Sequence, residues 1–254
     1  MKRLFVASLV LAALLSPTFA ADIPARMPTK AQPIVPIYDW TGFYLGVSLG
    51  ARVADVDGTT ISFGTPPGPP PFPALAHATY DSTTFRGGGY LGYNWQVSPR
   101  WLVGLEGDAA WGGSTSRVEF LQGVTPPPGA GDYSDVTQKW DAGIRGRIGY
   151  LVTPTWLLYL TGGVQWQGVA ATANCAVNTC GGAAFNQTNS TTRTGAAIGA
   201  GLETRIFANW LGRAEYRYAD FGTWHTSFGS PAVAIVKDFQ VKTHTAFVGL
   251  AHKF

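Results

Sequence analysis

The spacing of His225 and Ser227 could support nucleophilic chemistry, because a histidine two residues from a serine can act as its general base. A catalytic serine also needs an acidic group that orients the histidine. No glutamate follows this pair, and Asp238 falls in a different part of the connection between two expected strands. An aromatic residue flanks the pair on each side, as an interfacial segment would show anyway. We therefore expect no catalytic residue here.

The two cysteines, Cys175 and Cys180, are the only other residues whose spacing suggests chemistry. A metal site would need more ligands, and no histidine lies near them in the sequence. Four intervening residues exclude a redox C-x-x-C motif. In an oxidising envelope compartment we expect a local disulfide between them. His77 and His225 fall in different expected loops, so we expect no metal site and no cofactor.

Charged residues recur on one face of segments that alternate with period two. Between residues 140 and 150, apolar side chains at even positions face away from Asp141, Arg145 and Arg147. If the apolar face contacts lipid, the charges point into the lumen of a barrel; in a soluble sandwich the same charges would face water. Eight strands leave a lumen about wide enough for side chains to fill.

Buried charges are tolerated only when they are paired, so we expect a structural network across the lumen rather than a gated ion path. Its expected members are Arg86, Glu106, Asp108, Asp141, Arg145, Arg147, Glu203, Arg205, Arg213, Glu215 and Arg217.

Eight segments with this alternation follow residue 40, and each exceeds the roughly 9–11 residues that a tilted membrane strand requires. They cover residues 40–54, 84–97, 101–112, 138–151, 156–167, 192–207, 210–219 and 239–254. The connections alternate strictly between long and short. Four are long, at about 55–83, 113–137, 168–191 and 220–238, and the three short ones are each followed by a tryptophan. The pattern predicts an all-β, eight-stranded antiparallel up-and-down transmembrane barrel with short periplasmic turns and long extracellular loops.

The first 20 residues have the pattern of a cleaved secretory signal peptide. Lys2 and Arg3 precede an apolar run at 4–15, which is too short to span a bilayer as a helix. Small residues favour cleavage between Ala20 and Ala21. Residues 21–39 contain four prolines and are expected to form a periplasmic linker, so that the barrel covers 40–254.

The C-terminal strand and the composition both favour the outer membrane. Phe254 would lie in the aromatic girdle at the periplasmic rim. Only 13% of residues are charged, compared with about 25% in soluble domains. The formal net charge is +3 and no basic stripe is present, so we do not expect nucleic-acid binding.

Three stretches carry a resemblance to a known family: residues 38–46 (YDWTGFYLG), 214–218 (AEYRY) and 249–254 (GLAHKF). They resemble the alphaproteobacterial small outer-membrane β-barrel family, whose members are often called outer-membrane immunogenic or porin-family proteins. The resemblance implies an abundant, surface-exposed barrel with a structural or antigenic role. Outer-membrane lipid and lipopolysaccharide would surround it. Phe254 would be the signal that the barrel-assembly machinery reads.

We therefore expect a non-enzymatic outer-membrane protein that supports envelope integrity and presents surface loops. The first alternative is a narrow, nonspecific diffusion channel. The second is a lipid A-modifying hydrolase, because the spacing of His225 and Ser227 resembles that of lipid A deacylases.

Barrels that resemble this one can begin with Ala-Asp and be joined to peptidoglycan, which makes Ala21 a candidate attachment residue. The oligomeric state stays open.

Overall fold

The computed structural model describes residues 38–64, 76–119, 121, 131–176, 184–230 and 233–254. The expected signal peptide, its cleavage site at Ala20 and Ala21, and most of the expected linker lie outside these residues. The strands are β1 (Gly42–Gly64), β2 (Ala76–Thr79), β3 (Ser82–Gln96), β4 (Trp101–Glu119), β5 (Tyr133–Thr153), β6 (Trp156–Cys175), β7 (Phe185–Phe207), β8 (Trp210–Ser230) and β9 (Val233–Lys253). No helix in the described ranges is long and apolar enough to cross a membrane.

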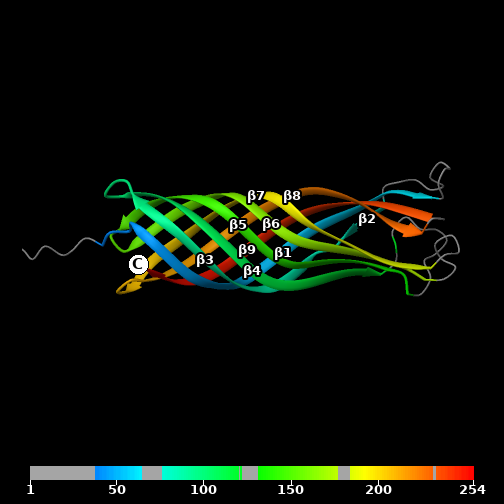
Figure 1. Cartoon of the computed structure of the whole chain (residues 1–254), viewed down its shortest axis with the longest axis horizontal. Coiled ribbons are helices and arrows are strands. Elements are labelled where there is room, and N and C mark those ends of the chain that lie inside the picture. The colour runs from blue at the N-terminus through cyan, green and yellow to red at the C-terminus, as the bar shows by residue number, and fades with distance from the viewer. Residues whose placement is uncertain (1–37, 65–75, 120, 122–130, 177–183, 231–232) are drawn as a thin grey trace, which may run out of the picture. The chain divides into compact units, whose positions relative to one another are not determined.

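The strands form one closed antiparallel sheet (Figure 1). Each of β4 to β8 pairs with the strand before it and the strand after it, and β1 pairs with β2, β3 and β9. This closure leaves neither end of the cycle as a free edge. The ladders between β3 and β4 and between β7 and β8 stop at Gly87 and Ala196, so these two pairs do not continue to the far ends of their strands. The antiparallel barrel agrees with the sequence prediction.

The number of strands differs from the prediction, because the described chain has nine strands rather than eight. The additional strand, β2, pairs with β1 in the same register as β3: Asp57 is opposite Thr79, and Ala54 is opposite Ser82. Tyr80 lies in the short connection between β2 and β3, and its amide donates to the Val56 carbonyl of β1 at 2.8 Å. Since β2 has β1 as its one paired neighbour, it lengthens the line of β3 and leaves eight strands in the closed cycle.

The strands are also much longer than expected. β1 and β7 each have 23 residues, more than twice the roughly 10 that cross a bilayer. Much of what the sequence indicated as long loops at 113–137, 168–191 and 220–238 is strand, since β4 continues to Glu119 and β8 to Ser230. Threonine-rich segments suit a strand whose neighbours supply pairing.

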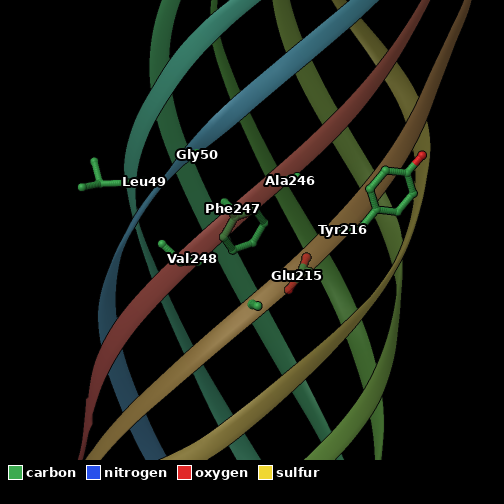
Figure 2. Close-up of a pocket in the computed structure, with 8 residues that line it drawn as sticks. Leu49, Gly50, Glu215, Tyr216, Ala246, Phe247 and Val248 are labelled. Carbon is green, nitrogen blue, oxygen red and sulfur yellow. The ribbon is translucent and has the colours of Figure 1, made fainter.

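The outward face of the barrel divides into two zones. Near the short turns, outward side chains are large and apolar, and we call this zone the apolar belt. Leu49 is 55% exposed and Val248 is 62% exposed, whereas Phe247, which precedes Val248, is buried (Figure 2). The belt includes Phe43, Leu45, Val47, Leu91, Trp101, Leu105, Ile144, Ile148, Leu158, Leu160, Ile198, Leu202 and Leu250.

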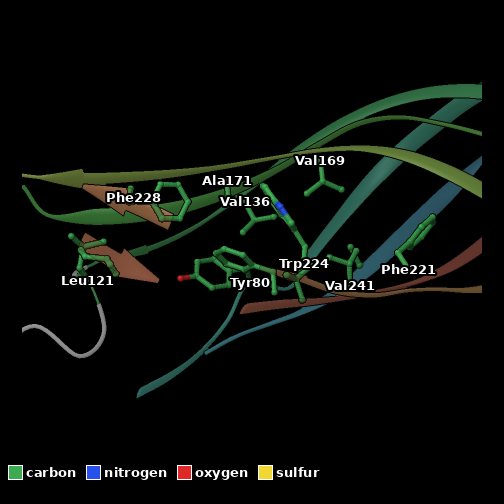
Figure 3. Close-up of a cluster of buried hydrophobic side chains, with 14 of the residues drawn as sticks. Tyr80, Leu121, Val136, Val169, Ala171, Phe221, Trp224, Phe228 and Val241 are labelled. Carbon is green, nitrogen blue, oxygen red and sulfur yellow. The ribbon is translucent and has the colours of Figure 1, made fainter. Parts of the chain in front are cut away.

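Beyond the belt the polarity of the two faces is inverted, and we call this zone the polar extension. It comprises residues 55–64, 76–81, 113–119, 133–139, 168–175, 185–195, 220–230 and 233–243. Here polar side chains such as Thr188 and Ser190 face outward, while Val136, Val169 and Trp224 are among the buried residues of an apolar core (Figure 3). The extension is therefore arranged like a water-soluble barrel.

A second apolar cluster fills the barrel at the end with the short turns, which we call the short-turn rim. Trp40 is fully buried there and packs with Leu102, Leu157 and Leu211. The Trp40 indole donates to the Pro154 carbonyl at 3.2 Å, and its backbone amide donates to Gln96. Residue 40 thus caps the lumen instead of beginning the first strand, which starts at Gly42.

Candidate functional site

A network of ion pairs occupies the lumen between the two apolar clusters. It joins five carboxylates to six guanidinium groups, and each of these side chains is at most 6% exposed. Its members are Arg52 on β1, Arg86 on β3, Glu106 and Asp108 on β4, Asp141, Arg145 and Arg147 on β5, Glu203 on β7, and Arg213, Glu215 and Arg217 on β8.

The strongest feature of this network is that its contacts cross the lumen. β4 and β8 are four strands apart in either direction around the cycle, so they form opposite walls. Arg213 on β8 nevertheless donates to Glu106 on β4 at 3.0 Å, and Arg217 donates to Asp108 at 3.0 Å. Opposite walls are therefore joined by direct hydrogen bonds at this level.

Asp141 on β5 accepts hydrogen bonds from two arginines, one on β1 and one on β3. Arg52 donates to it at 2.8 Å, and Arg86 forms two hydrogen bonds with it. Sequence reasoning did not include Arg52 in the network. Its position could have been found from parity, because Tyr44 and Arg52 both occupy even, inward positions of β1.

Arg205 is a correction to the expected network, because it is exposed and makes none of these ion pairs. It lies at the short-turn rim, where the pairing of β7 with β8 shifts in register between Arg205 and Phe207. Beyond the end of the lumen its guanidinium lies 4.8 Å from the ring centre of Tyr38, a cation–π contact. Burial raises the pKa of Tyr38 to about 12.

Tyrosines complete the coordination of the buried carboxylates. The Tyr44 hydroxyl donates to Glu106 at 2.8 Å, and the Tyr159 hydroxyl donates to Glu215 at 2.7 Å. Both rings lie against glycines of neighbouring strands. A Cβ atom at Gly92 would be 2.3 Å from the Tyr44 hydroxyl, and one at Gly201 would be 2.4 Å from the Tyr159 ring. Glycine is therefore required where these rings cross the lumen.

The structure changes one premise about the His225 and Ser227 pair. Antiparallel pairing places Asp238 of β9 opposite His225 of β8, and the Asp238 carboxylate contacts the His225 Nδ1 atom. The expectation that Asp238 lies apart from the histidine is wrong. His225 is 70% exposed, however, and within the described chain no hydrogen bond joins it to Ser227. All three residues belong to the polar extension rather than to the apolar belt.

The other candidate residues have separate surroundings. His77 contacts the Thr59 hydroxyl at 2.9 Å, and β1 and β9 separate its strand from that of His225. Cys175 is buried at the end of β6. Cys180 lies outside the described residues, so their pairing stays a prediction.

Aromatic side chains surround the short-turn rim. Trp101 and Trp156 are 48% and 43% exposed, and Trp101 packs edge-on against Tyr150. Phe254 is 67% exposed, its ring centre lies 5.9 Å from that of Phe43, and its amide donates to the Phe43 carbonyl. Such rings are typical of a membrane–water interface. A role of Phe254 as an assembly signal stays a prediction.

Comparison with known proteins identifies the family. The family model of the outer membrane protein beta-barrel domain matches residues 7–254. The chain belongs to this family. An outward-facing apolar band flanked by aromatic residues is typical of barrels that cross the outer membrane with their strands, and the apolar belt has this character.

Two curated relatives align over the whole chain, and a third aligns over part of it. The 31 kDa outer-membrane immunogenic protein of Brucella melitensis is 28% identical over 100% of both chains. The 25 kDa outer-membrane immunogenic protein of Brucella abortus is 26% identical over 100% of this chain and 99% of the relative. The 22 kDa outer membrane protein of Rhizobium leguminosarum is 27% identical over 74% of this chain and 68% of the relative.

Among solved structures, the outer membrane protein OprG from Pseudomonas aeruginosa has a similar fold. It matches with a TM-score of 0.56 and 16% identity, over 84% of this chain and 96% of OprG. This similarity concerns the barrel architecture alone.

Proposed function

We propose that the protein is a closed, non-enzymatic barrel of the outer membrane that supports envelope integrity and presents its polar extension at the cell surface. The observation that carries this proposal is the pairing of lumen charges from wall to wall, as between Arg213 and Glu106. A diffusion path needs charges that line the walls and leave the axis open. Here the guanidinium groups occupy the axis instead.

The two apolar clusters support the same proposal. One fills the lumen at the short-turn rim around Trp40, and the other fills the polar extension around Trp224. A chain that packs its lumen with an ion-pair network between two apolar layers is built for rigidity rather than for conduction. The barrel then serves as a stable support for the extension.

Presentation of the extension is supported by the relatives and by the outward residues. Two of the relatives are named immunogenic, and the extension of this chain exposes a polar surface built on paired strands. We infer that its antigenic surface consists of regular strand faces as well as loops. The extension would face the environment and the short-turn rim would face the periplasm.

A lipid A hydrolase receives less support from the geometry. His225 and Asp238 have the contact that orients a general base. The pair nevertheless lies in the polar extension, whose outward side chains include Thr188 and Ser190 rather than the large apolar residues of the belt. Ser227 makes no hydrogen bond with the histidine in the described chain.

Cysteine labelling on intact cells tests the proposed orientation. Ser190→Cys introduces an outward thiol in the extension, and Asn209→Cys introduces one in the turn between β7 and β8. We expect a membrane-impermeant maleimide to label Ser190→Cys on intact cells, and Asn209→Cys only after the cells are lysed. The unmodified protein gives the background from Cys175 and Cys180. If only Asn209→Cys were labelled on intact cells, the short-turn rim would face the environment, and the proposed orientation would be wrong.

A further inference from the structure

The apolar belt contains a hollow where β8, β9 and β1 run side by side (Figure 2). Its volume is about 520 Å³. Two alanines, Ala214 and Ala246, expose the backbone in its floor, while Leu49, Val248 and Tyr216 rise around it. The three larger side chains are between 52% and 62% exposed. The hollow therefore opens toward the lipid and not toward the lumen.

A row of polar contacts crosses the three strands at the end of the hollow nearest the extension. The Tyr216 hydroxyl lies 2.6 Å from Nδ1 of His244, and Nε2 of His244 lies 3.3 Å from a carboxylate oxygen of Asp55. The His244 ring on β9 thus contacts Tyr216 on β8 and Asp55 on β1. The ring of Tyr218 also packs on His244. The polar groups are thus held in place by one another.

The residues next to these contacts on the three strands include both acidic and basic side chains. Lys242 on β9 is opposite Asp55 on β1 and Asp220 on β8 in the strand register, so one basic residue is flanked by two acidic residues. The change from an apolar hollow to this charged row occurs within a few residues of each strand. A membrane lipid has the same order of groups, with an acyl chain below a charged headgroup.

We propose that this surface binds one glycerophospholipid whose headgroup carries both a phosphate and an amine. The acyl chain lies in the hollow against Ala214 and Ala246, the phosphate contacts Lys242, and the amine contacts Asp55. Two carboxylates for one ammonium disfavour a lipid that carries several phosphates, such as lipid A. This inference rests on the membrane position of the apolar belt.

Native mass spectrometry of the detergent-solubilised full-length barrel tests the proposal. The probes are phosphatidylethanolamine, phosphatidylglycerol, which lacks the amine, and lipid A. We expect one retained phosphatidylethanolamine per barrel, bound at least about tenfold more tightly than phosphatidylglycerol or lipid A. Ala246→Trp fills the hollow and should abolish retention. Ala109→Trp, at an outward alanine on β4 across the barrel, should retain the lipid.

A further variant tests the headgroup contact. Asp55→Asn should remove the preference for phosphatidylethanolamine over phosphatidylglycerol while leaving acyl-chain binding intact. Equal retention by Ala246→Trp and the unmodified protein would overturn the proposal, as would a preference for lipid A. Dimers that disappear in Ala246→Trp would assign the hollow to a second copy instead. Every variant is first checked for heat-modifiable gel migration and membrane insertion; loss of these in the unmodified protein would refute the proposed membrane barrel itself.

Discussion

At the scale of single residues, Glu106 contacts more side chains than any other carboxylate of the lumen network. It accepts hydrogen bonds from Arg213 and from the Tyr44 hydroxyl, and Arg147 lies 3.6 Å away. Its removal would take away one of the carboxylates that these buried arginines share, and leave Glu203 and Glu215 as their remaining partners. Buried ion pairs add little net stability as a whole, but the loss of one partner is costly. The network therefore fixes which strands face one another.

We expect Glu106→Leu to lower the free energy of unfolding by about 3–5 kcal/mol, because it removes one of the five carboxylates that balance six buried guanidinium groups. The measurement is the urea midpoint at which the heat-modifiable band is lost on gels. Glu119→Gln is the matched control, since Glu119 is exposed at the end of β4 and lies outside the lumen network. Equal midpoints for the two variants would show that the network is not stabilising.

Residue-level prediction from the sequence succeeded where strand parity decides the direction of a side chain. Glu203 and Arg213 are inward because they alternate with apolar neighbours. Arg205 shares the parity of Glu203, yet it lies beyond the end of the lumen. Parity gives the face of the sheet but not the height along the barrel axis. That height depends on how neighbouring strands are staggered, which is a property of the whole sheet.

At the scale of elements, the segments in the apolar belt were predictable and the extension was not. The segments at 101–112 and 156–167 lie within β4 and β6 because their outward residues are apolar. In the extension the outward residues of β7 include Thr188 and Ser190, and such a composition also suits loops. Its strand state depends on pairing with β6 along the full length of both strands, which no single segment reveals.

The extension should unfold separately from the belt, because its apolar core lies outside the charged lumen. We expect Trp224→Ala to destabilise the extension by about 3–5 kcal/mol, since it leaves a cavity in that core. Proteinase K added to intact cells should then cleave the extension while the belt stays protected. Thr223→Ala, at the exposed neighbouring position, is the control. Loss of the protected fragment as well would mean that belt and extension unfold together.

At the scale of the whole molecule, the filled lumen predicts that the barrel does not conduct. The hydrogen bonds from Arg213 and Arg217 span opposite walls, and Trp40 caps the short-turn rim. Purified protein in planar bilayers should give no reproducible conductance steps. Steps that disappear in Arg213→Gln or Arg145→Gln would show instead that these charges line an open path. The diffusion-channel alternative would then replace the closed barrel.

The last prediction concerns attachment of the barrel to the cell wall. Trp40 lies at the short-turn rim, so the segment that precedes it starts from the rim assigned to the periplasm. At about 3.1 Å per residue, the chain from Ala21 to Trp40 has a reach on the order of 50 Å. We propose that the Ala21 amine, freed by cleavage after Ala20, is linked to a peptidoglycan stem peptide. Digestion of purified peptidoglycan with muramidase and trypsin should then yield the peptide 21–26 joined to a muropeptide. Recovery of that peptide in free form alone would show that the barrel is held by the membrane and not by the wall.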